Sequence, residues 1–226
     1  PLFYLASPAL PIGAFAWSQG MEGAIAEGRL RNRAEVTAWL AGILAYGLGR
    51  FDIPLFSRCF KAALNRDAAG LDGWNALALA GRETAELREE EGRLGEALCR
   101  ILRDQNLMPA WVKTKRGLGY VAAFALAAVR LGEGAGSFAG EAGEALFHAA
   151  GAFVWSWLEN QVAAAAKAIP LGQTDGGRVL LELMPQVPEV VRQGLELPDS
   201  DIGASLPGLA LVSMRHERQY SRLFRS

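Results

Sequence analysis

Apolar residues recur at helical spacing in the first part of the chain. The segment 36–44 carries them at intervals of three and four, which places them on one face of a helix. Asn32 and Glu35 are spaced as a capping box just ahead of that segment. Gly47 and Gly49 follow it and predict its C-terminal end. We therefore expect a capped helix that begins after Asn32.

The same signals predict further helices along the chain. Asp52 and Pro54 are typical of the start of a second helix, and Asp72 is a candidate N-cap for a longer one. Nearer the other end, shorter helices are expected after Asp175 and at Pro188. No segment alternates between apolar and polar residues over a length that would indicate a strand.

Residues 117–168 are rich in glycine and alanine and carry few charges. Short side chains let helix backbones approach closely, so this half is expected to pack tightly against other helices or a second subunit. The patterns together predict an all-α fold. We expect a single-domain helical bundle of roughly ten helices that spans residues 1–226.

Charged residues crowd the segment 82–96. Glu89 and Arg93 are spaced as an i, i+4 pair in the favourable order, which supports a helix by a few tenths of a kcal/mol. A solvated helix face is the expected interpretation. A charged docking ridge is the alternative.

The overall composition limits the class of protein. The chain has 226 residues, of which 51% are hydrophobic, and its formal net charge is -1. The longest uncharged run near the centre of the chain, 145–158, is shorter than the roughly 20 apolar residues that a membrane span needs, so a core helix is expected there. His148 falls within this run and is interpreted as a core histidine.

Cysteine and histidine are sparse. Cys59 and Cys99 lie in apolar helical patterns and are expected to be buried free thiols in a reducing compartment, which predicts a cytoplasmic protein. With His148 and His216 they make up the whole supply of soft metal ligands, and none of the four are closely spaced. No metal site is expected within one subunit. A site shared across a dimer axis, built from His216 or Cys59, stays open.

One glycine-rich segment could be taken for a phosphate loop. Gly172 and Gly177 have the right spacing, but Arg178 and Val179 stand where a lysine and a hydroxyl residue are needed. A joint between helices with Asp175 as N-cap is the expected interpretation. No nucleophile and base pair is recognisable either, so we expect neither a cofactor nor enzymatic activity.

The C-terminal tail, 214–226, is the most distinctive stretch. It holds four arginines against one glutamate. If it is helical, Tyr220, Leu223 and Phe224 lie on one face. The tail is then either an arm that meets a partner or a last helix docked on its own core. Nucleic acid is not the expected partner, because the chain as a whole carries no basic excess.

The N-terminal arm, 1–20, is apolar and interrupted by prolines, including Pro8 and Pro11. Two interpretations are open. It packs down as an irregular strap, or it is a second arm that faces a partner.

Three segments of the chain, 5–22, 170–176 and 217–226, resemble the UreF family of urease accessory proteins. The match keeps the family's order along the whole chain, and the tail motif is its most specific part. Gly177 departs from the family pattern, in which glutamine is frequent. The resemblance implies an all-helical, non-enzymatic homodimer that bridges UreD (also called UreH) and the GTPase UreG and promotes nickel insertion into apo-urease.

The resemblance also implies which residues bind partners. They are Pro8, Pro11, Gln173, Asp175, Arg178, Glu217, Gln219, Tyr220, Ser221, Arg222, Leu223, Phe224 and Arg225. An alternative function is activation of the partner GTPase through an inserted arginine, for which Arg178 or a tail arginine is the candidate.

The expected dimer interface draws on the helices of 117–168. Left uncovered, Phe124, Phe138 and Phe153 would form apolar patches larger than a monomer usually shows. Ala127→Glu is expected to weaken the dimer if that face is the contact.

Overall fold

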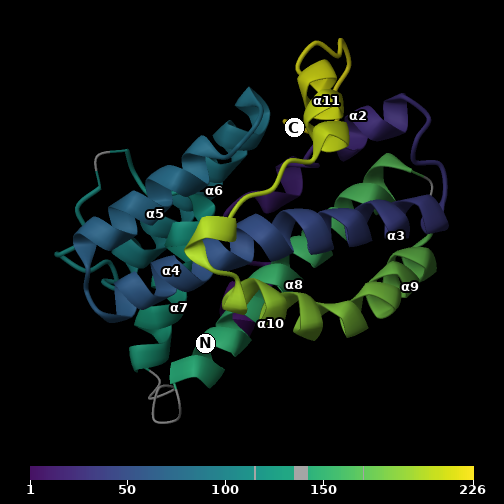
Figure 1. The fold of residues 1–226 in the computed structure, drawn as a ribbon. Coiled ribbons are helices and arrows are strands. Elements are labelled where there is room, and N and C mark those ends of the chain that lie inside the picture. Colours follow the sequence, from purple (N-terminus) through teal and green to yellow (C-terminus); the bar gives the residue numbers. More distant parts are fainter. Residues whose placement is uncertain (115, 135–141, 170) are drawn as a thin grey trace.

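The computed structural model describes residues 1–114, 116–134, 142–169 and 171–226. Within these ranges the regular elements are all helical and no strand occurs, so the all-α prediction is confirmed (Figure 1). One hydrophobic cluster runs through the bundle. None of the described helices combines the length and apolarity that a membrane crossing requires.

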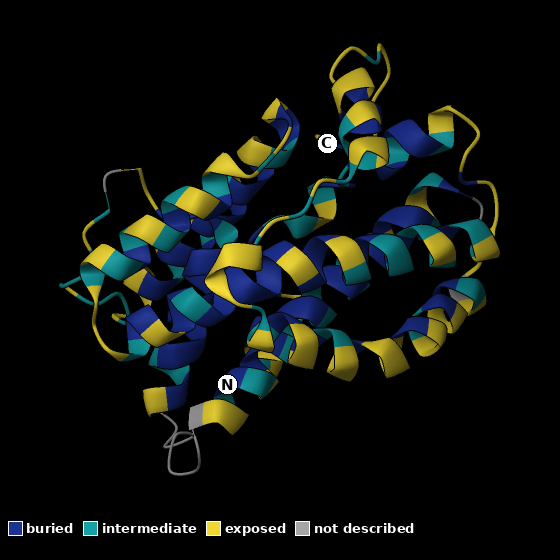
Figure 2. Cartoon of the chain, in the orientation of Figure 1, coloured by how far each residue is buried: buried dark blue, intermediate teal, exposed yellow. Residues whose placement is uncertain are grey.

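The elements follow one another in this order: α1 (Leu2–Leu5), η1 (Ala14–Ala16), α2 (Met21–Ala26), α3 (Arg33–Gly42), η2 (Ile43–Asp52), α4 (Ile53–Leu64), α5 (Ala68–Ala80), α6 (Ala85–Asp104), α7 (Tyr120–Gly134), α8 (Ala142–Ala168), α9 (Gln173–Leu183), η3 (Met184–Gln186), α10 (Val187–Glu196), η4 (Asp199–Asp201) and α11 (Pro207–His216). α4 and α7 pack against each other at the centre, with α5 and α6 beside them (Figure 1). Figure 2 shows α4 and α7 as the most buried part of the chain.

The capping box at the start of α3 is present. The side-chain oxygen of Asn32 accepts from the backbone N–H of Glu35 at 3.1 Å. The Glu35 carboxylate reaches back to the N–H of Arg31, at 2.7 Å, which is one residue further than expected. At α5 the cap is Asp67, whose carboxylate accepts from a backbone N–H of the first turn, so the prediction of Asp72 was wrong.

The expected break at Gly47 and Gly49 does not occur. α3 continues into η2, a π-helix, and η2 into α4 without leaving the helical region. A Cβ on Gly49 would lie 3.0 Å from Val190 of α10, so the glycine allows close packing instead of ending a helix. Asp52 makes no capping hydrogen bond. It ends the π-helix, a conformation often found at functional sites.

The small-residue half is packed inside one subunit, where α7 lies mainly against α4 and α6. Phe124 and Phe153 are buried in one subunit, where their ring centroids lie 5.4 Å apart, and Phe138 lies outside the described residues. Ala127 is fully buried as well. The apolar patches on which the dimer argument relied are therefore internal, and Ala127→Glu would disturb the core. The homodimer stays a prediction without this support.

Two expectations about exposure were wrong. His148 is exposed on α8 beside Glu144 instead of lying in the core. On α6, Glu86, Glu90 and Glu91 are buried, although the opposite side of the helix is solvated as expected. Buried carboxylates need partners, and these three have them in segments distant in sequence.

Cys59 and Cys99 are free thiols and both are buried, as predicted. Burial raises the pKa of Cys59 far above its usual range and that of Cys99 to about 11. Neither thiol is suited to act as a nucleophile, since the thiolate is the reactive form.

Candidate functional site

The tail is docked on its own chain, but not as a helix. α11 ends at His216, and residues 217–226 run back as irregular chain over α2 and α6, beside which the C-terminus lies (Figure 1). The predicted apolar face of Tyr220, Leu223 and Phe224 is therefore wrong. Tyr220 is fully exposed, Leu223 is 49% exposed and Phe224 is buried.

A carboxylate from α2 is the physical reason for this conformation. One oxygen of Glu22 accepts from the backbone N–H of Leu223 at 2.7 Å, and the other accepts from that of Phe224 at 2.8 Å. In a helix those amides would bond carbonyls of the preceding turn. Charge-assisted bonds to a carboxylate are about twice as strong as neutral ones, so they favour the irregular path.

His216 joins two helices beneath the tail. Its side chain is completely buried, and its Nδ1 and Nε2 lie 2.8 Å from Glu86 and 3.1 Å from Glu22. A protonated ring donates to both carboxylates and a neutral ring to only one. Arg222 donates to the second oxygen of Glu86 at 2.9 Å. Two basic side chains of the tail thus pair with the carboxylates of Glu22 and Glu86.

The final residue is held by the N-terminal segment. Ser226 accepts from the backbone N–H of Ser18 at 3.0 Å, and its hydroxyl lies 3.3 Å from the buried carboxylate of Glu90. The N–H of Arg225 donates to Ala16 at 2.8 Å. The Arg225 guanidinium also lies over the ring of Trp17. The two arms that the sequence set apart are therefore in direct contact.

We call the carboxylates of Glu22, Glu86 and Glu90 the tail clamp. Sequence reasoning missed them, because Glu86 and Glu90 were assigned to a solvated face. The available signal was their i, i+4 spacing on α6 together with an excess of arginines in the tail. Glycine shapes the same region, since a Cβ on Gly23 would lie 2.7 Å from the carbonyl oxygen of Val212 in α11.

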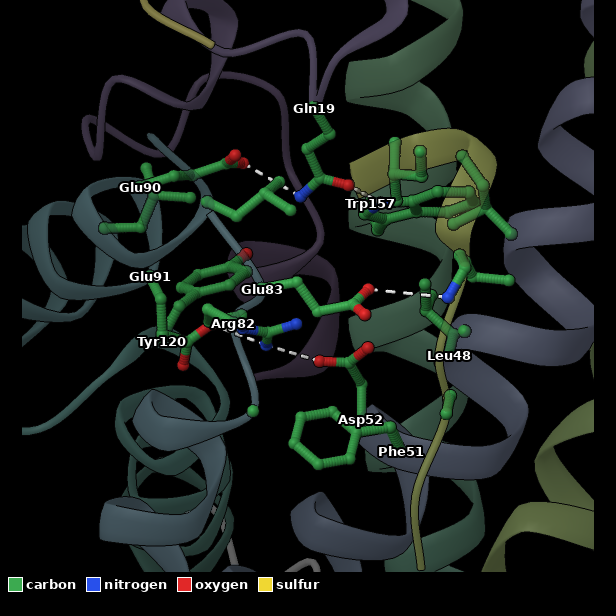
Figure 3. A pocket seen from close by; sticks show the side chains of 18 of the residues that line it. Gln19, Leu48, Phe51, Asp52, Arg82, Glu83, Glu90, Glu91, Tyr120 and Trp157 are labelled. Atoms are coloured by element: carbon green, nitrogen blue, oxygen red, sulfur yellow. Dashed lines mark hydrogen bonds and ion pairs between the residues drawn. The ribbon is translucent and has the colours of Figure 1, made fainter. Parts of the chain in front are cut away.

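A cavity of about 100 Å³ lies next to the tail clamp, between η2, α6, α7 and α8. Figure 3 shows Gln19 spanning part of it. The Gln19 amide donates to Glu90 at 2.9 Å and accepts from the indole N–H of Trp157 at 2.7 Å. Glu90 therefore connects the cavity wall to Ser226 at the end of the tail.

Arg82 is the positive charge of this cavity. It pairs with Asp52 and, at 2.7 Å, with Glu91, and it lies over the ring of Phe51 (Figure 3). Burial disfavours the charged form, but the two carboxylates outweigh burial and raise the pKa of Arg82. Glu91 also accepts from the N–H of Val121, which secures the first turn of α7.

In the described part of the chain, the side chains that hydrogen-bond to Glu90 are the neutral ones of Gln19 and Ser226. Burial raises the pKa of Glu90 to about 7, against the hydrogen bonds from Gln19 and Ser226. A carboxyl that changes protonation near neutral pH is typical of functional sites, although structural networks produce the same effect. Among the described residues, no group of three or more His, Cys, Asp or Glu could hold a metal ion.

The other predicted tail residues have distinct positions. Glu217 accepts from the N–H of Ala85 at 3.1 Å and so completes the first turn of α6. The Gln219 side chain donates to Ser221 at 2.8 Å, and Ser221 is exposed. These contacts shape the loop that carries Tyr220.

The N-terminal arm packs down as a strap. Leu5, Leu10 and Trp17 are buried in the core, whereas Pro8 and Pro11 are exposed. The interpretation as a free second arm is not supported, because the segment contributes core side chains.

The candidates in α9 lie apart from the tail. α9 packs on α3 and α8. Asp175 and Arg178 form an exposed ion pair at 3.1 Å, and the N-cap is Gly172 instead of Asp175. Gln173 begins the helix, but its side chain lies outside the described part of the structure.

Comparison with known proteins identifies the family. Residues 30–184 match the model of the UreF family. The urease accessory protein UreF of Chromohalobacter salexigens is 47% identical over 226 residues, which cover all of this chain and 93% of that protein. Those of Hahella chejuensis and Methylobacillus flagellatus are 42% and 39% identical, and in each case all of this chain matches 96% of the relative. Identity at this level over the full chain, on an all-helical fold, shows that the chain belongs to the UreF family.

Proposed function

We propose that this protein is a non-enzymatic urease maturation factor that bridges UreD/UreH and the GTPase UreG in the cytoplasm. In this role it promotes nickel insertion into apo-urease, and nickel is a cargo of the assembly. Full-length similarity to proteins named urease accessory protein UreF supports the assignment. A catalytic role is not part of the proposal.

The observation that carries the proposal is the loop that the tail clamp holds. The side chains of Tyr220 and Leu223 are exposed at its outer side. The backbone N–H groups of Leu223 and Phe224 donate to the carboxylate of Glu22. Burying these two side chains against a partner contributes about 1.5–3 kcal/mol each before ordering costs. Because the loop is already shaped, little of that gain is lost to ordering.

A binding experiment tests the proposal. Purified Tyr220→Ser/Leu223→Ser protein is expected to lose UreD in a pull-down, and urease activation in a reconstituted assay is expected to fall with it. The control is Tyr46→Ser/Leu181→Ser, which removes two exposed apolar side chains from η2 and α9. Undiminished UreD binding by the tail variant, with the same melting temperature as the unmodified protein, would show that the tail is not the anchor.

The alternative, stimulation of UreG through an inserted arginine, has exposed candidates in α9 and in the tail. The side chain of Arg178 is 60% exposed at the start of α9, where it pairs with Asp175, and that of Arg215 is 62% exposed. The rate of GTP hydrolysis by UreG is measured with the unmodified protein and with the Arg178→Ala variant, which separates the two functions for this arginine. The bridging function predicts equal rates for the two proteins.

Light scattering on the purified protein measures the expected homodimer directly. A 24.2 kDa species at tens of micromolar would contradict it.

A further inference from the structure

A second surface, on the far side of α6 from the tail clamp, has its own chemistry. A groove of about 650 Å³ lies between α6 and the loop that leads into α7. Helix positions 88, 92, 96, 99 and 103 fall within one arc of α6 and form one wall. Val112, Thr114 and residues 116–119 contribute the other wall. The volume suits several side chains of a partner segment.

The groove is basic, although the protein is not. Four arginines and two glutamates line it, a net charge of +2, whereas the whole chain has a net charge of -1. The lining charges are Arg88, Arg93, Arg103, Arg116, Glu89 and Glu96.

Two of the arginines are already engaged. Arg93 lies 3.5 Å from Glu89 and 3.9 Å from Glu96, so it neutralises much of the acidic charge in the groove. Arg88 donates to the backbone carbonyl of Arg82. Arg103 and Arg116 are exposed and form no ion pair with any residue that the structure describes. They lie on opposite walls and are the cations available to a ligand.

The floor between these cations is apolar. Cys99 and Leu118 are buried there, and Leu79, Met108 and Val112 are half-buried. A groove of this kind matches a segment that presents carboxylates at its edges and apolar side chains at its centre.

The wall opposite α6 is held rigidly. The fully buried amide of Asn75 donates to the carbonyl of Gly117 at 2.8 Å and accepts from the N–H of Gly119 at 2.7 Å. A Cβ on Gly95 would lie 2.1 Å from the carbonyl oxygen of Leu118, which shows how closely α6 and the loop pack. A groove with fixed walls does not need to order itself when it binds.

We propose that this groove binds an acidic, amphipathic segment of a protein partner, with Arg103 and Arg116 pairing with its carboxylates. Charge complementarity selects this occupant. The apolar floor favours a peptide over a nucleic acid, for which clustered cations along a broader basic surface would be expected. The proposal concerns a surface separate from the tail, so it does not depend on how the tail binds UreD.

The probe for this groove is a fluorescein-labelled 16-residue peptide with glutamates on one helical face and leucines on the other. Fluorescence anisotropy is expected to show binding that weakens as salt rises from 50 to 300 mM, because exposed ion pairs are screened. Arg103→Glu/Arg116→Glu is expected to weaken binding at least tenfold at low salt. Arg50→Glu/Arg192→Glu, which reverses two exposed arginines outside the groove, should stay within twofold.

Two further variants and two further ligands complete the test. Arg103→Gln/Arg116→Gln is the second variant, and it is used if the charge reversal lowers the melting temperature. Tyr220→Ser/Leu223→Ser should bind the peptide normally, so a failure of the tail proposal would not affect this one. Equal binding by the groove variants would overturn the proposal. So would equal binding of a peptide with glutamine in place of glutamate, or tighter binding of a 16-nucleotide single-stranded DNA.

Discussion

The imidazole Nδ1 of His216 lies 2.8 Å from a carboxylate oxygen of Glu86, and both side chains are buried. The two residues are 130 positions apart in the chain. Their contact brings the end of α11 onto α6, and from there the tail turns back toward the N-terminal strap. The tail is therefore an integral part of the folded core at its base and an exposed loop only at its outer side.

The first prediction concerns Glu22, whose carboxylate holds the tail backbone. In Glu22→Gln an amide N–H₂ replaces one acceptor and faces a backbone N–H of Leu223 or Phe224. A donor without an acceptor costs about 1–3 kcal/mol where it is buried, and less at the exposed N–H of Leu223, so the tail should open more often. Hydrogen exchange at these two amides and a denaturant melt measure the change. In the control Glu189→Gln, which alters an exposed ion pair with Arg192, both measurements should match the unmodified protein.

The second prediction is a pH dependence from Glu90. Its pKa is raised by burial from 4.5 to about 7. Between these values the folded protein holds a proton that the unfolded chain has lost, so stability falls as pH rises through this window. At 1.36 kcal/mol per unit the loss is at most about 3 kcal/mol. Glu90→Gln should remove this decline.

Denaturant melts at pH 5, 6, 7 and 8 on both proteins measure that difference. Glu89→Gln, at the exposed neighbouring position, is the control and should follow the unmodified protein. Parallel curves for Glu90→Gln and the unmodified protein would mean that Glu90 does not titrate in this range.

The third prediction uses two glycines of α6. Alanine at Gly95 places a Cβ 2.1 Å from a backbone oxygen of the groove wall, so Gly95→Ala should cost about 1–3 kcal/mol. A Cβ at Gly92 would meet no other atom within 4 Å, and Gly92→Ala should stabilise the helix by up to about 1 kcal/mol. Thermal melting of the pair checks both signs. Similar melting temperatures would contradict the close packing of α6 on this loop.

The fourth prediction concerns a chain that ends at Ser213. It loses His216 and Arg222, which are the basic partners of Glu22 and Glu86, and with Ser226 the hydroxyl that contacts Glu90. Uncompensated buried charge is strongly destabilising, so the melting temperature should fall clearly. Tyr220→Ser, which removes only an exposed side chain, should melt as the unmodified protein does. Unchanged melting of the truncated chain would show that the clamp contributes little to folding.

Local pattern was sufficient for several features of this protein. The period of the apolar residues predicted the helical class, and the Asn32 cap follows from hydrogen bonds within one turn. The buried thiols followed from the apolar helices that carry them. Such features depend on neighbours three or four residues away, so the sequence alone determined them.

Only the tertiary structure decided where charged side chains lie. Glu86 and Glu89 belong to one acidic run, yet one is buried against His216 and the other is solvated. The spacing of apolar residues in the tail allowed a helix, but the carboxylate of Glu22 binds two of its backbone N–H groups in another conformation. At such positions, contacts with residues distant in sequence supply the free energy that outweighs the local conformational preference. The spacing of residues within the segment does not indicate which distant residues these are.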